Sequence, residues 1–434
     1  MSRPAQYALL LAALLLAAFV GWRIVATRTS DSLATSAPRE SLAWDAGNPE
    51  ARLALAQQQL DHGDPDQAAA TARELLRNAP LQADAFTVLA RAAAARGESD
   101  RARQLFGIAL RRAPRNPYAR AWMIGDELQH GDYPAALHNV DVLFGFAPQQ
   151  RTALIPLLAQ VASRQSDFAS ALGQHLAQRP RWRDAMLDEM LAHAPAVAID
   201  NVFGTLQSAA GGLSDNEAGR WFARLEQDGE WGEAYSRWVS RVGIDTRQGV
   251  PLVFNGSFER PPTGIGFDWV MRGEPGVEIE RVRIAGASGD FAAQVTFRRR
   301  RANDMGFQQA LLLAPGHYSL SFRARADNLR SDRGLAWDIV CVSGGAAIAS
   351  SPRLDGSFDW KTVSTDFSVP ASNCPAQRLL LTNPGAGGSA KVVSGTLWFD
   401  DFKIVPVASP SPSGTALDSS RLPPLLQNPA TPHP

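Results

Sequence analysis

The feature that most constrains this chain is a repeat of 34 residues. Glycine, alanine and proline each recur three times at that interval, every type at its own offset: Gly63, Gly97 and Gly131; Ala68, Ala102 and Ala136; Pro80, Pro114 and Pro148. A period between about 20 and 50 residues is typical of a solenoid of stacked units. The small residues let two antiparallel helices approach closely, the glycine ends the first helix, and the proline begins the next unit. We therefore expect an all-α solenoid.

The repeat continues less regularly towards the C-terminus. The turn between the two helices of a unit recurs at residues 166–168 with Ala171, one residue later than the period predicts. It recurs again at residues 229–231 with Ala234. The stretch 182–213 has a helical pattern but fits the repeat poorly. The predicted solenoid spans 48–243, with about five helical pairs. Its period and closing proline resemble the tetratricopeptide repeat (TPR), and the resemblance implies a groove that binds protein partners.

The N-terminus carries an apolar segment that predicts the compartment. Residues 8–20 are an unbroken apolar run, and the run extends to Ala26 with only Arg23 interrupting it. This is close to the roughly 20 residues that cross a bilayer as a helix, which predicts a transmembrane anchor over 7–26 with 1–6 in the cytoplasm. A cleaved signal peptide is the alternative, because the strict apolar core is short. Residues 27–47, rich in Ser, Thr and Ala, predict a linker.

Charge and cysteine content narrow the remaining classes. Acidic and basic residues number 43 each, so the chain has no net positive charge to attract nucleic acid. The use of arginine in place of lysine suggests a bacterial source. We expect the bulk of the chain in the periplasm, attached to the inner membrane. Cys341 and Cys374 are too few for a zinc site but enough for one disulfide, with two buried free thiols as the alternative.

The sequence changes character after Val250. Runs of alternating apolar and polar residues, such as 317–326 and 395–405, are separated by clusters of Gly, Pro, Asn and Ser. This pattern predicts a β-sandwich over 250–407. The remaining residues, 408–434, are rich in Pro and Ser and predict a disordered tail. The expected fold is therefore multidomain, with a transmembrane helix, an all-α solenoid and an all-β sandwich.

Three sequence motifs stand out in the predicted sandwich: an opening N-G-S-F-E at 255–259, a central L-A-P-G-H-Y-S-L-S-F at 313–322 and a closing W-F-D-D-F at 398–402. In this order they resemble the jelly-roll carbohydrate-binding modules found beside bacterial xylanases and cellulases. The resemblance implies polysaccharide binding and a structural calcium between Glu259 and Asp400 or Asp401. Calcium prefers several hard oxygen ligands, which paired carboxylates supply. The alternative is a solvated acid beside a turn.

A glycan site needs an exposed aromatic face and polar groups. Trp337, Trp360 and Trp398 lie in patterns that favour the core. Trp269 lies in a loop-like stretch and is the best candidate among them for an exposed ring, with burial in the core as the alternative. The run Arg298, Arg299, Arg300 and Arg301, expected in a loop, predicts a clamp for acidic sugar groups, because guanidinium groups pair bidentately with carboxylates. A solvated charge cluster is the alternative.

No catalytic constellation is recognisable. The H-E-x-x-H and G-x-S-x-G motifs are absent, and residues 385–391 depart from a phosphate-binding loop. We therefore expect no catalytic residues and a non-enzymatic periplasmic scaffold, binding proteins and acidic polysaccharide in exopolysaccharide or envelope assembly. Two alternatives are a glycan-active enzyme with an unrecognised acid pair and a structural module that binds only protein.

Overall fold

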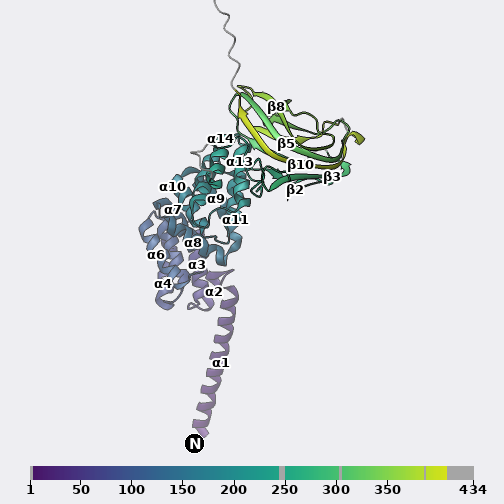
Figure 1. Ribbon diagram of the computed structural model, residues 1–434. Coiled ribbons are helices and arrows are strands. Elements are labelled where there is room, and N and C mark those ends of the chain that lie inside the picture. Colours follow the sequence, from purple (N-terminus) through teal and green to yellow (C-terminus); the bar gives the residue numbers. More distant parts are fainter. Residues whose placement is uncertain (1–2, 244–249, 303–304, 386–387, 408–434) are drawn as a thin grey trace, which may run out of the picture. The chain divides into compact units, whose positions relative to one another are not determined.

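The computed structural model describes residues 3–243, 250–302, 305–385 and 388–407 (Figure 1). The chain divides into two compact units, Met1–Leu213 (unit 1) and Ser214–Pro434 (unit 2). Unit 1 is helical in its described part, and unit 2 combines one helical pair with a β-sandwich. The tail predicted to be disordered, 408–434, lies outside the described residues.

Unit 1 begins with a long apolar helix, α1 (Arg3–Leu33). Its segment Leu11–Leu33 has a mean hydropathy of 1.6, and its side chains are exposed from residue 11 to residue 25. The helix is therefore long and apolar enough to cross a membrane, a property that signal sequences and membrane anchors share.

Residues 27–47 are helical and packed, where the sequence predicts a linker. α1 continues to Leu33 and α2 (Pro38–Trp44) follows it. The buried Ser30 and Ser41 share a hydrogen bond of 2.9 Å between their Oγ atoms, and Asn48 Nδ2 donates to Ser30 Oγ at 2.9 Å. Hydroxyl and amide groups make these contacts, so the segment shows no apolar periodicity from which a helix would be predicted.

The three regular repeats form three helical pairs in the register that the sequence predicts. The pairs are α3 (Pro49–Asp61) with α4 (Pro65–Asn78), α5 (Ala83–Ala95) with α6 (Ser99–Arg112), and α7 (Pro117–His130) with α8 (Tyr133–Phe146). The glycine between the helices of each pair has a left-handed φ of 76–80°. Ala68, Ala102 and Ala136 are completely buried, as expected for residues at a close helix contact. This part of the chain is TPR-like.

Two less regular pairs complete unit 1. They are α9 (Arg151–Arg164) with α10 (Ser166–Ala177), and α11 (Arg183–His193) with α12 (Ala196–Ser208). α10 and α12 approach so closely that a Cβ atom at Gly173 would lie 2.8 Å from Thr205 Cβ. Here the close contact that needs a small residue is between α10 and α12, which belong to different pairs. The small residues therefore do not keep the spacing of the regular repeat, and 182–213 fits that repeat poorly.

The sandwich of unit 2 consists of two antiparallel five-stranded sheets. Sheet A has the order β1 (Val270–Met271), β4 (Phe307–Leu311), β9 (Gln377–Thr382), β6 (Ala336–Cys341), β7 (Ala347–Ser350). Sheet B has the order β2 (Val277–Arg283), β3 (Phe291–Arg301), β10 (Val392–Pro406), β5 (Gly316–Arg330), β8 (Gly356–Val369). Aromatic side chains fill the space between the sheets, among them Trp337, Phe307, Phe399 and Phe402. A disulfide between Cys341 and Cys374 ties the end of β6 to the segment before β9.

The last helical pair, α13 (Asp215–Gln227) and α14 (Trp231–Val242), belongs to the same compact unit as the sandwich. The Trp238 ring lies 5.0 Å from the Phe254 ring and 5.7 Å from the Phe267 ring, measured between centroids. A Cβ atom at Gly266 would lie 2.6 Å from the Trp238 ring, so this loop needs glycine. The predicted solenoid (48–243) and the predicted sandwich (250–407) therefore meet inside unit 2.

Candidate functional site

Trp269 does not provide the exposed sugar platform that the sequence predicts. Its side chain is fully buried, with the ring 5.2 Å from that of Phe258 and 5.7 Å from that of Trp337. The preceding residue explains the difference, because the Asp268 carboxylate accepts hydrogen bonds from the backbone N–H groups of Thr263 and Trp269, both at 2.7 Å. This turn directs the indole into the core, and the prediction of exposure is wrong.

The four arginines are exposed, but they lie at the end of strand β3 and not in a loop. Arg298 forms an ion pair with Glu278 on β2, and Arg299 has a positive φ of 55° next to an irregularity in the pairing of β3 with β10. Because Trp269 is in the core, the structure does not bring the arginines and this ring together at one exposed surface. The predicted joint glycan site is not formed.

Trp360 and Trp398 lie half-buried on the outer face of sheet B, and Trp337 alone of the three lies in the core as predicted. A guanidinium group lies 5.2 Å from the centroid of each outer ring, Arg323 over Trp360 and Arg325 over Trp398. Strand alternation gives the reason for Trp398, since its neighbours on β10 are completely buried and it must point the other way. This alternation is visible in the sequence around Trp398. The prediction that Trp360 and Trp398 lie in the core is wrong.

The acids of the predicted calcium site act as hydrogen-bond acceptors for the loop before β3. Glu259 Oε1 accepts two backbone N–H groups at the start of β3, at 3.0 and 3.1 Å. Asp400, buried on the outer face of sheet B, accepts the N–H groups of Ser288 and Asp401, while Asp401 pairs with Lys403 at 2.8 Å. Burial raises the pKa of Asp400, although these hydrogen bonds oppose the effect.

These partners limit the fit to a metal ion. Within the described ranges, no three His, Cys, Asp or Glu side chains gather as a metal site would require. The two carboxylates of Glu259 and Asp400 do approach the same loop, from the opening and the closing segments of the sandwich. Calcium here remains a prediction, and no function below depends on it.

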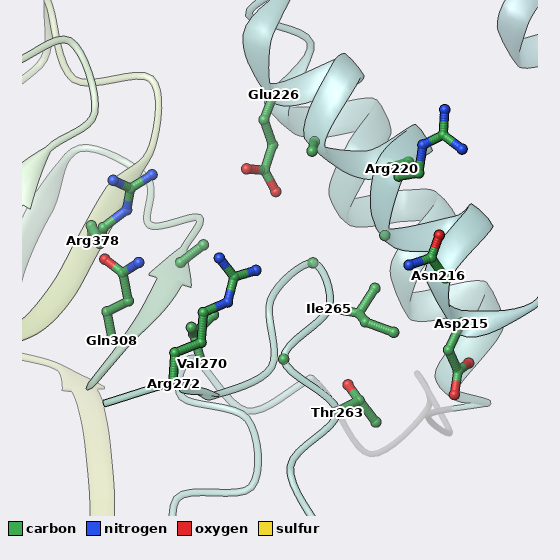
Figure 2. Close-up of a pocket in the computed structure, with 15 residues that line it drawn as sticks. Asp215, Asn216, Arg220, Glu226, Thr263, Ile265, Val270, Arg272, Gln308 and Arg378 are labelled. Atoms are coloured by element: carbon green, nitrogen blue, oxygen red, sulfur yellow. The ribbon is translucent and has the colours of Figure 1, made fainter. Parts of the chain in front are cut away.

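A cavity of about 570 Å³ lies in unit 2 between α13 and the outer face of sheet A (Figure 2). Glu226 reaches into it from α13, Gln308 from β4 and Arg378 from β9, and Arg272 follows β1. Both strand residues point outward because their neighbours on each strand are buried. The apolar part of the lining comes from Ile265 and Val270, together with three glycines and two alanines: Gly219, Gly264, Gly266, Ala223 and Ala310.

The polar groups of this cavity are short of partners. Arg272, Gln308 and Arg378 have no side-chain hydrogen bond or ion pair with another residue in the described part of the chain. Burial raises the pKa of Glu226 to about 7, and the positive charge of Arg378 opposes that rise. Asp215, by contrast, forms an ion pair with Arg241 at 2.6 Å. The cavity therefore offers two guanidinium groups and an amide to a ligand.

The sequence pattern does not indicate this site, because its residues come from elements far apart in the chain. Glu226 lies in a predicted solenoid helix and Arg378 in a predicted sandwich strand. They line one cavity because the pair α13 and α14 packs against loop residues that precede β1, where Trp238 contacts Phe254 and Phe267. No motif spacing connects them.

No protein-family model matches the chain, and no curated protein matches it. Solved structures with similar architecture fall into two groups. The first includes YrrB, described as a TPR protein with an unusual peptide-binding site, at 11% identity and a TM-score of 0.28, covering 49% of this chain and 93% of YrrB. The second includes a CBM4 module, at 18% identity and a TM-score of 0.27, covering 36% of this chain and 99% of the module.

The second group also includes the CBM22-1 xylan-binding domain of Paenibacillus barcinonensis Xyn10C, at 16% identity and a TM-score of 0.25, covering 36% of this chain and 94% of that domain. The chain thus matches TPR proteins over about half its length and carbohydrate-binding modules over its C-terminal third. Identities and TM-scores this low do not transfer the ligand of any of these proteins to this chain.

Proposed function

We propose that this protein is a non-enzymatic scaffold of the bacterial envelope that binds protein partners through its helical repeats and polysaccharide through unit 2. The observation that carries the saccharide part is the polar cavity on the outer face of sheet A, with Arg272, Arg378 and Gln308 unpartnered in the described structure. Sugar hydroxyl and acid groups are the ligands that such donors suit. Exopolysaccharide or envelope assembly is the setting that we propose.

The N-terminal helix and the disulfide support the location in this proposal. An exposed apolar helix favours an anchor in the inner membrane, and a disulfide between Cys341 and Cys374 favours an oxidising compartment such as the periplasm. In the same proposal, the sandwich is of jelly-roll type. A reporter enzyme fused after Pro434 is expected to be active only in its exported form, and extraction of membranes at high pH is expected to leave the protein in the pellet. Release at high pH would favour cleavage of the helix.

The geometry of the cavity supports a binding role over glycan hydrolysis. Its two acids, Asp215 and Glu226, lie eleven residues apart on α13, which is about 16 Å along the axis at about 1.5 Å per residue. Paired carboxylates of glycosidases lie about 5–10 Å apart. Asp215 is also held by Arg241. These acids are therefore too far apart to act as a catalytic pair.

Affinity electrophoresis of the full chain in detergent tests the proposal. Gels containing bacterial acidic exopolysaccharide are expected to retard the wild type, and the Arg378→Gln variant less. The same incubations should release no new reducing ends. Retardation together with new reducing ends would favour a glycan-active enzyme, and no retardation on any glycan would favour a module that binds only protein.

A further inference from the structure

We propose that the cavity between α13 and sheet A is a binding site for a carboxylate-bearing ligand, held by Arg272 and Arg378, with Glu226 as the group that makes binding depend on pH. This inference rests on the proposed function in one respect only, the use of a saccharide as the first ligand to test.

The guanidinium groups indicate the charge of the ligand. Arg272 follows β1 and Arg378 lies on β9, with β4 between these two strands of sheet A, and both side chains line one cavity (Figure 2). Neither guanidinium group forms an ion pair or a side-chain hydrogen bond with a carboxylate of the described residues. Two like charges at one partly enclosed site repel each other and favour an anion between them. A carboxylate satisfies both, because each of its oxygens accepts a hydrogen bond from a planar guanidinium group. Gln308 lies on the strand between β1 and β9 and adds an amide donor.

Glu226 faces this pair from α13. Two further charged side chains line the same cavity, Asp215 and Arg220, both on α13. Of these, Asp215 is neutralised by Arg241. Arg378 is the charge that acts on Glu226, and burial keeps the pKa of Glu226 near 7 in spite of it. Glu226 therefore changes its charge within the physiological range of pH.

The charge of Glu226 decides what the arginines offer. The neutral acid leaves both guanidinium groups to the ligand and can donate its own proton as a hydrogen bond to the ligand carboxylate. The ionised form attracts Arg378 and repels a second carboxylate. We therefore expect affinity to be highest below pH 7 and to fall as pH rises through about 7, where Glu226 ionises.

Isothermal titration calorimetry of the full chain in detergent tests this. The probe is a tetramer of galacturonic acid, and its fully methyl-esterified form is the uncharged control. Between pH 6 and pH 8, the wild type is expected to lose affinity for the acid about tenfold. Arg378→Gln and Arg272→Gln should each lose at least about tenfold at pH 6. Glu226→Gln should bind at both pH values with no more than about a twofold difference.

Matched variants outside the cavity serve as controls. Arg333→Gln and Glu280→Gln change exposed side chains on the sandwich and should leave binding and its pH dependence unchanged. Circular dichroism spectra and melting temperatures establish that each variant is folded.

Each outcome separates the inference from the proposed function. Equal binding of the acid and its ester by the wild type, unaffected by either arginine variant, would overturn the inference while leaving saccharide binding in place. A pH dependence that persists in Glu226→Gln would refute the role of that residue. If neither saccharide binds but acetate raises the melting temperature of the wild type and not of Arg378→Gln, the carboxylate site is supported and the saccharide function fails. If nothing binds, both fail.

Discussion

Replacing Glu226 with glutamine should stabilise unit 2 in a way that depends on pH. Glutamine keeps the size and polarity of the side chain and removes the charge. Burial raises the pKa of Glu226 from its ordinary value of 4.5 to about 7 in the folded chain, so the folded state holds this proton more tightly than the unfolded state does. The free energy of unfolding of the wild type must therefore fall as pH rises from about 4.5 to about 7.

The size of the effect follows from the same values. Each pKa unit corresponds to about 1.4 kcal/mol, so the ionised carboxylate costs at most about 3 kcal/mol at pH 8. Glu226 is only half-buried, and solvent screens part of this cost, so we expect about 1–2 kcal/mol. Glu226→Gln should match the wild type near pH 4.5 and exceed it by that amount at pH 8.

Urea denaturation between pH 4.5 and pH 8.5 measures this difference. Tryptophan fluorescence follows the unfolding of the whole chain, and it includes Trp221 and Trp238 on α13 and α14, in the part of unit 2 that holds Glu226. Glu280→Gln, on an exposed strand position, is the control and should show no such trend. A difference between Glu226→Gln and wild type that is constant across this range, or largest at low pH, would refute the assignment of Glu226 as a buried acid.

Three further predictions concern other parts of the chain. Reducing the Cys341–Cys374 disulfide, which closes a loop of 33 residues, should lower the stability of unit 2 by roughly 3–4 kcal/mol in denaturant titrations, and an unchanged midpoint would contradict this. Ala102→Trp should cost about 1–3 kcal/mol or more in thermal unfolding, because Ala102 is completely buried between helices and the contact cannot accept a ring. If calcium binds between Glu259 and Asp400, adding calcium after chelation should raise the melting temperature of the wild type by several degrees. Asp400→Asn should abolish this rise. An unchanged melting temperature of the wild type would contradict the calcium site.

The sequence alone determined the features that depend on local periodicity. The recurrence of Gly63, Gly97 and Gly131 set the helix boundaries of the three regular pairs, because the chain adopts a left-handed conformation at each of these glycines after the first helix ends. The burial of Ala102 and its equivalents followed from the same period. The alternation of apolar and polar residues likewise predicted the sandwich. The same alternation along β10 indicates that Trp398 lies on the outer face of sheet B.

Tertiary structure decided what depends on groups distant in the chain. Trp269 points inward because the Asp268 carboxylate fixes the turn before it, which no alternation pattern encodes. Residues 27–47 pack as the end of α1 and the helix α2, and buried hydrogen bonds join Ser30 to Ser41 and Asn48 beyond the end of its own helix. The cavity exists because α13 and α14 pack against loop residues before β1, so that Glu226 and Arg378 line one partly enclosed space. Local periodicity indicates which face of a helix or strand is buried, but not which other element covers that face. The pKa of Glu226 depends on the groups that surround it, and those groups come from elements distant in the chain.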